Sequence, residues 1–382
     1  MHRTIAVLGL GQMGLSALDL LLEQLAGAQF LCVDRSEQAV NTAVAKAPDR
    51  VRGLAIDVAS GDLDFTGIDV VLNLTGPFFA GSDHAARAAI EHGAAYIDIS
   101  DDVEGTRTVL NLAPHAEAAG VPVITGAGFS PGITNWIACE LLDQHPHADG
   151  IQIAWVVHEA DPGGLAPLRH MLHLAVSPCP LLVDGEWQES PGFVPQTAKC
   201  FDFPDPIGTV ETFDTAHPEP LTLVRRFPRL RYASCKGALH PAWANGAFST
   251  LGRIGFGYLD NHVQMDGLNI DPTEVLWRML WRRHDRRART GGSSYTAAQV
   301  LALEGDDVVA GLGVHDNAVM SRATGLGAVI ATEVLLQYGA PPGAHGPEGL
   351  RSDAAVAMFS QLAHDTGSFP GGLVPIPLAA IP

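Results

Sequence analysis

Short apolar runs alternate with longer segments of mixed polarity in the first third of the chain. Six apolar runs predict strands over residues 4–8, 30–33, 51–56, 70–74, 96–100 and 121–125. Helical spacing and capping side chains predict helices over residues 36–46, 82–92 and 103–119. Strands that alternate with helices are typical of a parallel sheet with helices on both faces. We therefore predict an α/β domain with a doubly wound parallel sheet over residues 1–130.

The first apolar run leads directly into a glycine-rich turn. Gly9, Gly11 and Gly14 have the G-x-G-x-x-G spacing of dinucleotide-binding turns, which also occurs in ordinary glycine turns. The first glycine can take a backbone conformation that is closed to other residues, and the second lets backbone N–H groups approach a pyrophosphate. The third lets helix and strand pack closely, and the positive end of that helix faces the phosphates.

The second apolar run ends in Asp34, twenty residues after Gly14. A Rossmann unit places there the carboxylate that binds the ribose hydroxyls, so strand, glycines, helix and acid together predict dinucleotide binding. Asp34 would repel a 2′-phosphate, which favours NAD, whereas Arg35 could attract one, so NADP remains possible. The residues expected to bind the cofactor here are Gly9, Leu10, Gly11, Gln12, Met13, Gly14, Asp34 and Arg35.

Residues that follow the other predicted strands are further candidates, because ligands bind beyond the carboxyl ends of such strands. The acid after the third strand either lies near the adenine or is an ordinary solvated loop acid. The turn after the fourth strand is expected to line the nicotinamide side, and amides after the sixth could border cofactor and substrate. These cofactor candidates are Asp57, Thr75, Gly76, Pro77, Gly128 and Phe129.

An acidic stretch from Asp101 to Glu104 follows the fifth predicted strand and opens the next helix. Acidic side chains cap first-turn N–H groups and suit the positive end of a helix. The alternative is a carboxylate beside the substrate. Both interpretations stay open at this point.

The pattern changes near residue 149. Alternating residues over 151–158 predict a sheet that is covered on one face, and we expect a second, α+β domain over residues 131–345. Short helices are predicted over 165–175 and from Asp271 onward. The second helix is expected to bury a stripe and to end in a solvated run of arginines. Its predicted stripe is Val275, Leu276, Met279 and Leu280, and the run is Arg282, Arg283, Arg286, Arg287 and Arg289.

Composition narrows the function classes. Asp and Glu outnumber Lys and Arg by 42 to 23, a formal charge of −19 that opposes binding to nucleic acid or anionic membranes. No uncharged apolar run reaches the length of a membrane helix, so we expect a cytoplasmic protein. The five cysteines are scattered without a C-x-x-C pair or a nearby histidine at metal spacing, so reduced thiols and no metal site are expected.

Several stretches together resemble the saccharopine dehydrogenase-like family. They are residues 96–102, 126–135, 217–223, 324–325 with 328–331, and 346–349. The resemblance implies interconversion of amines and imines with a nicotinamide cofactor. It also implies a Rossmann domain interrupted by a substrate domain that forms homodimers, with residues 346–382 returning to the Rossmann domain. The shorter chain, Asp34, and Val224-Arg225 where a proline is frequent point to a small amino acid or its imine rather than saccharopine itself.

Amine–imine chemistry needs a group that holds or relays a proton and a cation for the substrate carboxylate. Asp101 is the first candidate for the proton, because it follows a strand at the expected cofactor edge. The other candidates for catalysis or substrate binding are His170, Lys236, Glu159, His240, Arg169, Arg225 and Arg231. Two alternatives are a hydroxy acid or aldehyde dehydrogenase and a non-catalytic NAD(P)-binding sensor.

Overall fold

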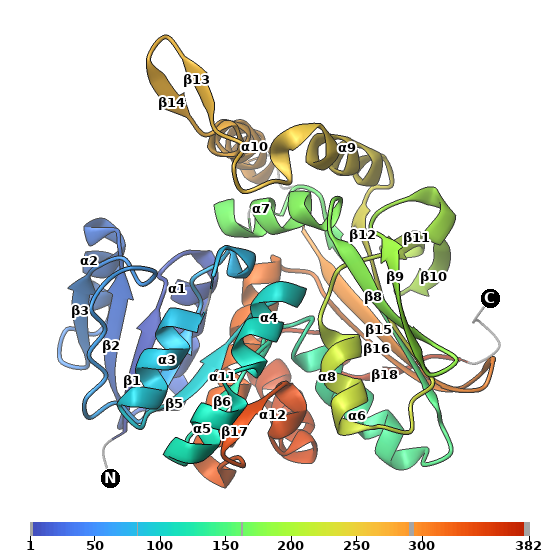
Figure 1. The fold of residues 1–382 in the computed structure, drawn as a ribbon, viewed down its shortest axis with the longest axis horizontal. Coiled ribbons are helices and arrows are strands. Elements are labelled where there is room, and N and C mark those ends of the chain that lie inside the picture. The colour runs from blue at the N-terminus through green and yellow to red at the C-terminus, as the bar shows by residue number, and fades with distance from the viewer. Residues whose placement is uncertain (1–2, 82, 162, 290–293, 378–382) are drawn as a thin grey trace. The chain divides into compact units, whose positions relative to one another are not determined.

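The computed structural model describes residues 3–81, 83–161, 163–289 and 294–377. These residues form two compact units, each built around its own sheet (Figure 1). The first unit comprises Met1–Trp136 and Ser321–Phe359, and the second comprises Ile137–Met320 and Ser360–Pro382. Ser82, the first residue of one predicted helix, lies outside the described residues.

The first unit contains a seven-stranded parallel sheet in the order β17-β6-β5-β4-β1-β2-β3. This order confirms the predicted doubly wound α/β class, with its reversal between β1 and β4. The strands are β1 (Thr4–Leu8), β2 (Gln29–Asp34), β3 (Val51–Ala55), β4 (Val70–Asn73), β5 (Ala95–Asp98), β6 (Pro122–Ile124) and β17 (Gly343–His345). Apolar side chains from β1, β4 and β5 lie in its core and are fully buried, as the apolar runs predict.

Helices connect these strands and cover the sheet. They are α1 (Gln12–Gln24), α2 (Glu37–Lys46), α3 (Asp83–Glu91), α4 (Val103–Leu110), α5 (Ala113–Ala119) and most of α11 (Met320–Tyr338). Helices α6 (Ile133–Gln144) and α12 (Ser352–Thr366) each begin in this unit and continue in the second. The single helix predicted over 103–119 is wrong. It breaks after Leu110 because Pro114 lies in the first turn of α5, where a continuing helix would lose a hydrogen bond and meet the proline ring.

Helix α11 carries the chain back into the first unit. A Cβ on Gly327 would lie 2.0 Å from the backbone oxygen of Gly128, and a Cβ on Gly325 would lie 3.0 Å from Oγ of Ser16. The small residues of α11 therefore let its backbone lie against α1 and the loop after β6. The division after Trp136 and before Ser321 differs from the expected boundaries at 130 and 345, because this small-residue helix already packs within the first unit.

The second unit contains a mixed sheet in the order β10-β11-β12-β7-β15-β16-β18, with β8 and β9 attached to β12. The strands are β7 (Gly150–His158), β8 (Pro178–Val183), β9 (Glu186–Pro191), β10 (Lys199–Phe203), β11 (Gly208–Asp214), β12 (Tyr232–His240), β15 (Thr296–Glu304), β16 (Asp307–Asp316) and β18 (Val374–Pro375). A separate hairpin pairs β13 (Val263–Met265) with β14 (Leu268–Ile270). Strands β7 and β12 run parallel and place His158 opposite His240, whereas β15 runs antiparallel to β7.

Helices α7 (Leu165–Leu174), α8 (Glu219–Arg226), α9 (Trp243–Leu251) and α10 (Pro272–Arg289) belong to the second unit. Short helical turns lie at Phe78–Ala80 and Pro347–Gly349 in the first unit and at Pro195–Thr197 and Gly252–Phe256 in the second. No helix among the described ranges has both the length and the apolar character needed to cross a bilayer.

Two expectations about the second unit are wrong. All nine residues of β7 are buried, so this strand is covered on both faces. Ala154 and Val156 pack into a core cluster with aromatic side chains of β10, while Trp155 points to the opposite face and stacks on His217. The predicted stripe of α10 is not its buried face either, since Val275 is 49% exposed and Met279 is 63% exposed.

Candidate functional site

The glycine-rich loop joins the carboxyl end of β1 to α1. Gly9 has φ +83°, and a Cβ there would lie 2.8 Å from the backbone oxygen of Leu74. A Cβ on Gly14 would lie only 1.8 Å from the oxygen of Gly9, well below any real contact. Two of the three glycines are therefore required by the chain itself, before any ligand is considered.

Gly11 differs from the other two glycines. It is exposed, its φ is −71°, and a Cβ built on it meets no atom within 4 Å. It stands at the N-cap of α1 and offers no side chain to the first-turn N–H groups. Gln12 is exposed and Met13 half-buried beside it, whereas Leu10 is buried. The open space above Gly11, at the positive end of a helix, fits the pyrophosphate of a dinucleotide.

Asp34 is held in place by backbone groups at the end of β2. Its Oδ2 accepts from Leu10 N at 2.7 Å, and its Oδ1 accepts from Ser36 N at 2.8 Å. The carboxylate thus links the glycine loop to the start of α2 in the position expected for a ribose-binding acid. Arg35 next to it is exposed. The carboxylate of Asp34 therefore fixes the glycine-rich loop even in the absence of a ligand.

The turn after β4 is fixed by a side chain that the sequence analysis missed. Asn73 Oδ1 accepts from Thr75 N at 3.0 Å and from Thr75 Oγ1 at 2.5 Å, while its Nδ2 donates to Tyr96 Oη at 2.9 Å. Gly76 and Pro77 follow in the same turn. Asp57, after β3, is exposed and accepts from Ala59 N. A buried polar residue at the end of an apolar run was the available signal for Asn73.

Asp98 is a second buried polar residue at a strand end. Its Oδ1 accepts from Ser100 N at 2.9 Å, Thr125 Oγ1 at 2.8 Å and Gly126 N at 2.9 Å. Complete burial raises the pKa of this carboxyl group, although the hydrogen bonds oppose the rise. Asp98 therefore ties the ends of β5 and β6 together beneath the loops that follow them.

Replacing Asp98 with alanine should lower the free energy of unfolding by about 3 kcal/mol, because three buried donors lose one acceptor. Equilibrium urea unfolding measures this. The exposed Asp57→Ala is the matched control and should change stability by less than about 1 kcal/mol. Equal effects of the two substitutions would contradict the structural role of Asp98.

The acidic stretch and the loop after β6 make specific contacts within the first unit. Asp102 is at the N-cap position of α4, but its Oδ2 accepts from Phe79 N at 3.0 Å instead of capping that helix. Asp101 directly before it is half-buried. Gly128 N donates to Pro131 O at 2.9 Å, and Phe129 is buried. The backbone of Gly128 also lies close to Gly327 of α11, so Gly128 has a structural role as well.

A polar cluster closes one end of the sheet in the second unit, where β7 and β12 end and β15 begins. We call it the strand-end cluster; its members are His158, Glu159, His240, Arg283, Arg287 and Tyr295. The carboxylate of Glu159 is buried and makes a bidentate pair with the guanidinium of Arg283, with Arg283 Nη2 at 2.6 Å from Oε1. Arg287 Nη2 lies 2.9 Å from His158 Nε2, and Tyr295 Oη is hydrogen-bonded to His240 Nδ1.

Burial shapes the proton affinities in the strand-end cluster. Burial, together with the charge of Arg287, lowers the pKa of His158 to about 4. Burial also lowers the pKa of His240 and raises that of Tyr295. Both imidazoles are therefore neutral at neutral pH.

The neutral state of His158 predicts a pH dependence of stability. Its pKa is near 6.5 in the unfolded chain, so between about pH 6.5 and pH 4 the unfolded state binds more protons and stability falls as the pH falls. After allowance for solvent screening the loss is about 1–2 kcal/mol. His158→Gln should therefore lose less stability than the unaltered protein over this window, whereas the exposed His115→Gln should follow it. An equal loss of unfolding free energy between pH 6.5 and pH 4 in all three proteins would contradict the prediction.

The remaining candidates in the second unit are engaged elsewhere. Lys236 is buried and pairs with Asp214 at 2.5 Å while donating to Thr197 O at 2.7 Å. Arg169 pairs with Asp271, the residue whose carboxylate caps α10. Three further candidates lie apart from the strand-end cluster: His170 is buried with Nε2 3.4 Å from His217 Nε2, Arg225 is exposed on α8, and Arg231 is exposed 3.7 Å from Asp184.

The structure thus brings Glu159 and His240 together and adds four residues that sequence reasoning missed. The interpretation of the arginine run as a solvated helix end is wrong for Arg283 and Arg287, which are half-buried against Glu159. Arg282 and Arg286 are exposed, as that interpretation expects. Because Arg283 and Arg287 are four residues apart, they share one face of α10, and this spacing was the available signal.

Known proteins resemble this chain both in the sequence of its first unit and in its overall fold. Residues 5–124 match the family model of the saccharopine dehydrogenase NADP binding domain. The whole fold is similar to apo saccharopine dehydrogenase (L-Glu forming) from Saccharomyces cerevisiae, with a TM-score of 0.62 and 13% identity over 98% of this chain and 99% of that one.

Two further structural similarities are weaker. GenD2 from gentamicin A biosynthesis in complex with NAD gives a TM-score of 0.43 and 13% identity over 98% of this chain and 97% of that one. The WlbA dehydrogenase from Chromobacterium violaceum in complex with NADH and UDP-GlcNAcA gives 0.43 and 11% over 99% and 96%.

The space above Gly11 is open, and Asp34 is held in place by a backbone N–H group of the glycine loop. The family match runs from the second residue of β1 to the end of β6, and the structural match covers nearly the whole chain. Residues 5–124 therefore match an NAD(P)-binding domain of the saccharopine dehydrogenase type, and the chain as a whole shares the fold of saccharopine dehydrogenase.

Proposed function

We propose that this protein is an NAD(P)-dependent oxidoreductase that interconverts an amino acid or amine and its imine. The observation that carries the proposal is the prepared dinucleotide loop within a chain of saccharopine dehydrogenase fold. The enzyme with that fold bears a name that describes formation of L-glutamate, an amino acid. The strand-end cluster supplies the two chemical features that such a substrate needs, namely guanidinium groups and neutral imidazoles.

The bound nicotinamide would supply or accept the hydride at the carbon of the C–N bond. The chain's own groups have two tasks in this scheme. Arg283 and Arg287 can bind a substrate carboxylate, since a guanidinium presents a fork that matches it. A neutral His240 can accept the proton that the amine loses during oxidation, and return it to the nitrogen in the reverse direction.

Asp101 stays the first candidate for the proton-holding group in the first unit, because it is half-buried directly after the buried end of β5. Glu159 is a candidate only together with Arg283, which occupies both of its oxygens. The contacts of Lys236 and Arg169 favour structural roles for those two residues. His170, Arg225 and Arg231 remain candidates.

We propose NAD as the preferred cofactor. Asp34 presents a negative charge where NADP carries its 2′-phosphate, and the adjacent Arg35 is a cation that could offset it. Asp34→Asn keeps one oxygen as an acceptor and removes the charge. It should weaken NAD binding by about tenfold and bring the NADP affinity up to or above that of NAD. Calorimetric titration measures both affinities, and equal losses for the two cofactors would contradict this role of Asp34.

A carbonyl dehydrogenase is the second candidate, and the hydrogen-bonded pair of Tyr295 and His240 favours it, because a hydroxyl-bearing substrate needs such an acid–base group. Reduction of a keto acid by NADH, assayed with and without added ammonia or amine, separates the two. Amine-dependent oxidation of NADH supports imine reduction, whereas an amine-independent rate supports the carbonyl reaction. Binding of NAD without turnover would instead indicate a sensor.

We also propose a homodimer formed through an apolar face of the second unit. This face comprises exposed large side chains of four consecutive segments, namely α9, the turn after it, the β13–β14 hairpin and α10. Figure 1 shows the backbone of these segments. They are Trp243, Ile254, Tyr258, Leu259, Val263, Met265, Leu268, Val275, Met279 and Trp281, each between 40% and 69% exposed. An apolar surface of this extent is typical of an interaction site.

A second copy of this chain is the occupant that the charges favour. The segment 257–271 that contains the hairpin carries three aspartates and no lysine or arginine, whereas α10 carries six arginines against two acids. In a twofold dimer the hairpin of each copy can meet α10 of the other.

Sedimentation equilibrium should give a dimer for the unaltered protein and a monomer for Met265→Asp/Leu268→Asp. The control Trp187→Ser alters an exposed aromatic residue outside this face and should stay dimeric; a dimeric hairpin variant would contradict the proposal.

A further inference from the structure

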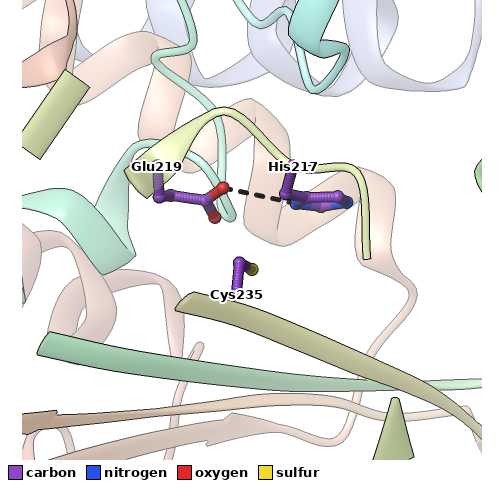
Figure 2. Close-up of side chains that lie close together, drawn as sticks. All are labelled: His217, Glu219 and Cys235. Carbon is purple, nitrogen blue, oxygen red and sulfur yellow. Dashed lines mark ion pairs between the residues drawn. The ribbon is translucent and has the colours of Figure 1, made fainter. Parts of the chain in front are cut away.

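Three potential metal ligands from two segments meet in the interior of the second unit (Figure 2). His217 and Glu219 lie on either side of Pro218 at the beginning of α8, and Cys235 projects from β12. His217 is 4% exposed, Glu219 is 0% and Cys235 is 1%. One ligand atom of each residue lies within 4.8 Å of the others, and His217 Nδ1 is 3.5 Å from Glu219 Oε2.

The donor set is specific in its chemistry. Imidazole, carboxylate and thiolate are the three ligand types of zinc sites, at distances of about 2.0–2.3 Å from the metal. Such distances place neighbouring ligand atoms of a tetrahedral site about 3.3–3.8 Å apart. The measured separation of His217 Nδ1 and Glu219 Oε2 is already within this range. A thiolate in the set favours a borderline-soft cation over magnesium or calcium.

The orientation of His217 is an independent sign of a ligand. Its Nδ1 is fully shielded from solvent, has no hydrogen-bond partner among the described residues, and points toward Glu219 (Figure 2). Its Nε2 lies 3.4 Å from Nε2 of His170, and its ring stacks on Trp155 with centroids 5.2 Å apart. A proton on Nε2, donated to His170, leaves the lone pair on Nδ1. Metal-binding histidines are usually oriented in this way, by a hydrogen bond from the ring nitrogen that does not bind the metal.

Charge considerations agree with a cation at this place. A carboxylate that is completely buried requires a proton or a positive charge close by. His217 is one group that can supply it, but this imidazole is cationic only when it is protonated. A divalent ion would supply the positive charge independently of pH.

We propose that His217 Nδ1, Glu219 and Cys235 Sγ bind one divalent cation of the zinc class. The ion would join the start of α8 to the centre of the sheet and leave one coordination position for water or another small ligand. The sequence alone predicts no metal site, because Cys235 is distant from His217 and Glu219 in the chain. This inference does not depend on the oxidoreductase activity.

Cobalt binding tests the site directly, because a thiolate–cobalt bond gives a charge-transfer band in the near ultraviolet. The full-length protein, stripped with a chelator, should take up one equivalent of cobalt with this band, and zinc should displace it. Cys235→Ser should abolish the band and Glu219→Gln should weaken cobalt binding at least tenfold. Cys179→Ser is the matched control, since Cys179 is also buried and lies on the neighbouring strand β8.

Metal analysis of the unaltered protein keeps the test independent of the variants' folding. Protein produced with zinc in the medium should retain one equivalent after dialysis, and chelation should lower its melting temperature by several degrees. Absence of retained metal together with no band at excess cobalt would overturn the proposal. So would an equal band in Cys235→Ser, which would show that other residues bind the ion.

Discussion

Replacing Gly11 with alanine should reduce the affinity for NAD(P) by about a hundredfold, or about 2.7 kcal/mol, and leave the stability of the protein almost unchanged. A Cβ at Gly11 meets no protein atom within 4 Å, and the backbone there has an ordinary negative φ. The fold therefore does not require glycine at this position. A methyl group would instead occupy the space through which the loop amides approach the pyrophosphate.

Gly14→Ala is the contrasting control. Its Cβ would collide with the oxygen of Gly9 at 1.8 Å, so we expect it to lose both stability and cofactor binding. Calorimetric titration and thermal unfolding of the two variants separate a ligand effect from a folding effect. Gly11→Ala with an affinity within about threefold of the unaltered protein would contradict the placement of the pyrophosphate.

Replacing Arg283 with alanine should lower kcat/KM by at least about a hundredfold and the free energy of unfolding by about 2 kcal/mol. The first effect follows from the proposed binding of the substrate carboxylate. The second follows because the buried carboxylate of Glu159 loses its bidentate partner, while Arg287 remains 3.9 Å from it. The partial exposure of Arg283 keeps the stability loss below that of a fully buried pair.

A double variant separates the two effects of Arg283. In Arg283→Ala/Glu159→Gln the buried charge is removed along with its partner, so most of the lost stability should return. Activity should stay low, because the guanidinium is still missing. Urea unfolding and steady-state kinetics measure the two quantities. Recovery of activity in the double variant would show that Arg283 acts only through Glu159.

Local signals were sufficient for much of the first unit. The apolar runs that predicted β1 and β2, the glycine turn and the acid at position 34 depend on residues close together in the chain, and each appears where the spacing placed it. The return of the chain to the first unit at α11 was harder to predict from the sequence. Its cause is the close approach of Gly327 to Gly128, a contact between residues almost two hundred positions apart.

The second unit was predicted less well because its contacts are not local. One face of β7 is covered by aromatic residues of β10, and on the other face Trp155 stacks on His217. The sequence pattern gives no reason to pair either segment with β7. The exposure of Val275 and Met279 and the burial of Arg283 reverse the face that hydrophobicity alone assigns to α10. Polar and apolar residues exchange their usual positions on this helix, consistent with a site on one face and a partner on the other.

The central claim is that the protein transfers a hydride to or from a carbon–nitrogen bond. The most direct measurement follows the absorbance of reduced nicotinamide while the purified full-length protein meets NAD or NADP with a panel of amines and amino acids, and NADH or NADPH with mixtures of keto acids and amines. We expect turnover with at least one amine or amino acid, faster with NAD than with NADP, and strongly reduced in Gly11→Ala at the same cofactor concentration. Turnover of hydroxy acids or aldehydes alone, or tight NAD binding with no turnover across the panel, would contradict it.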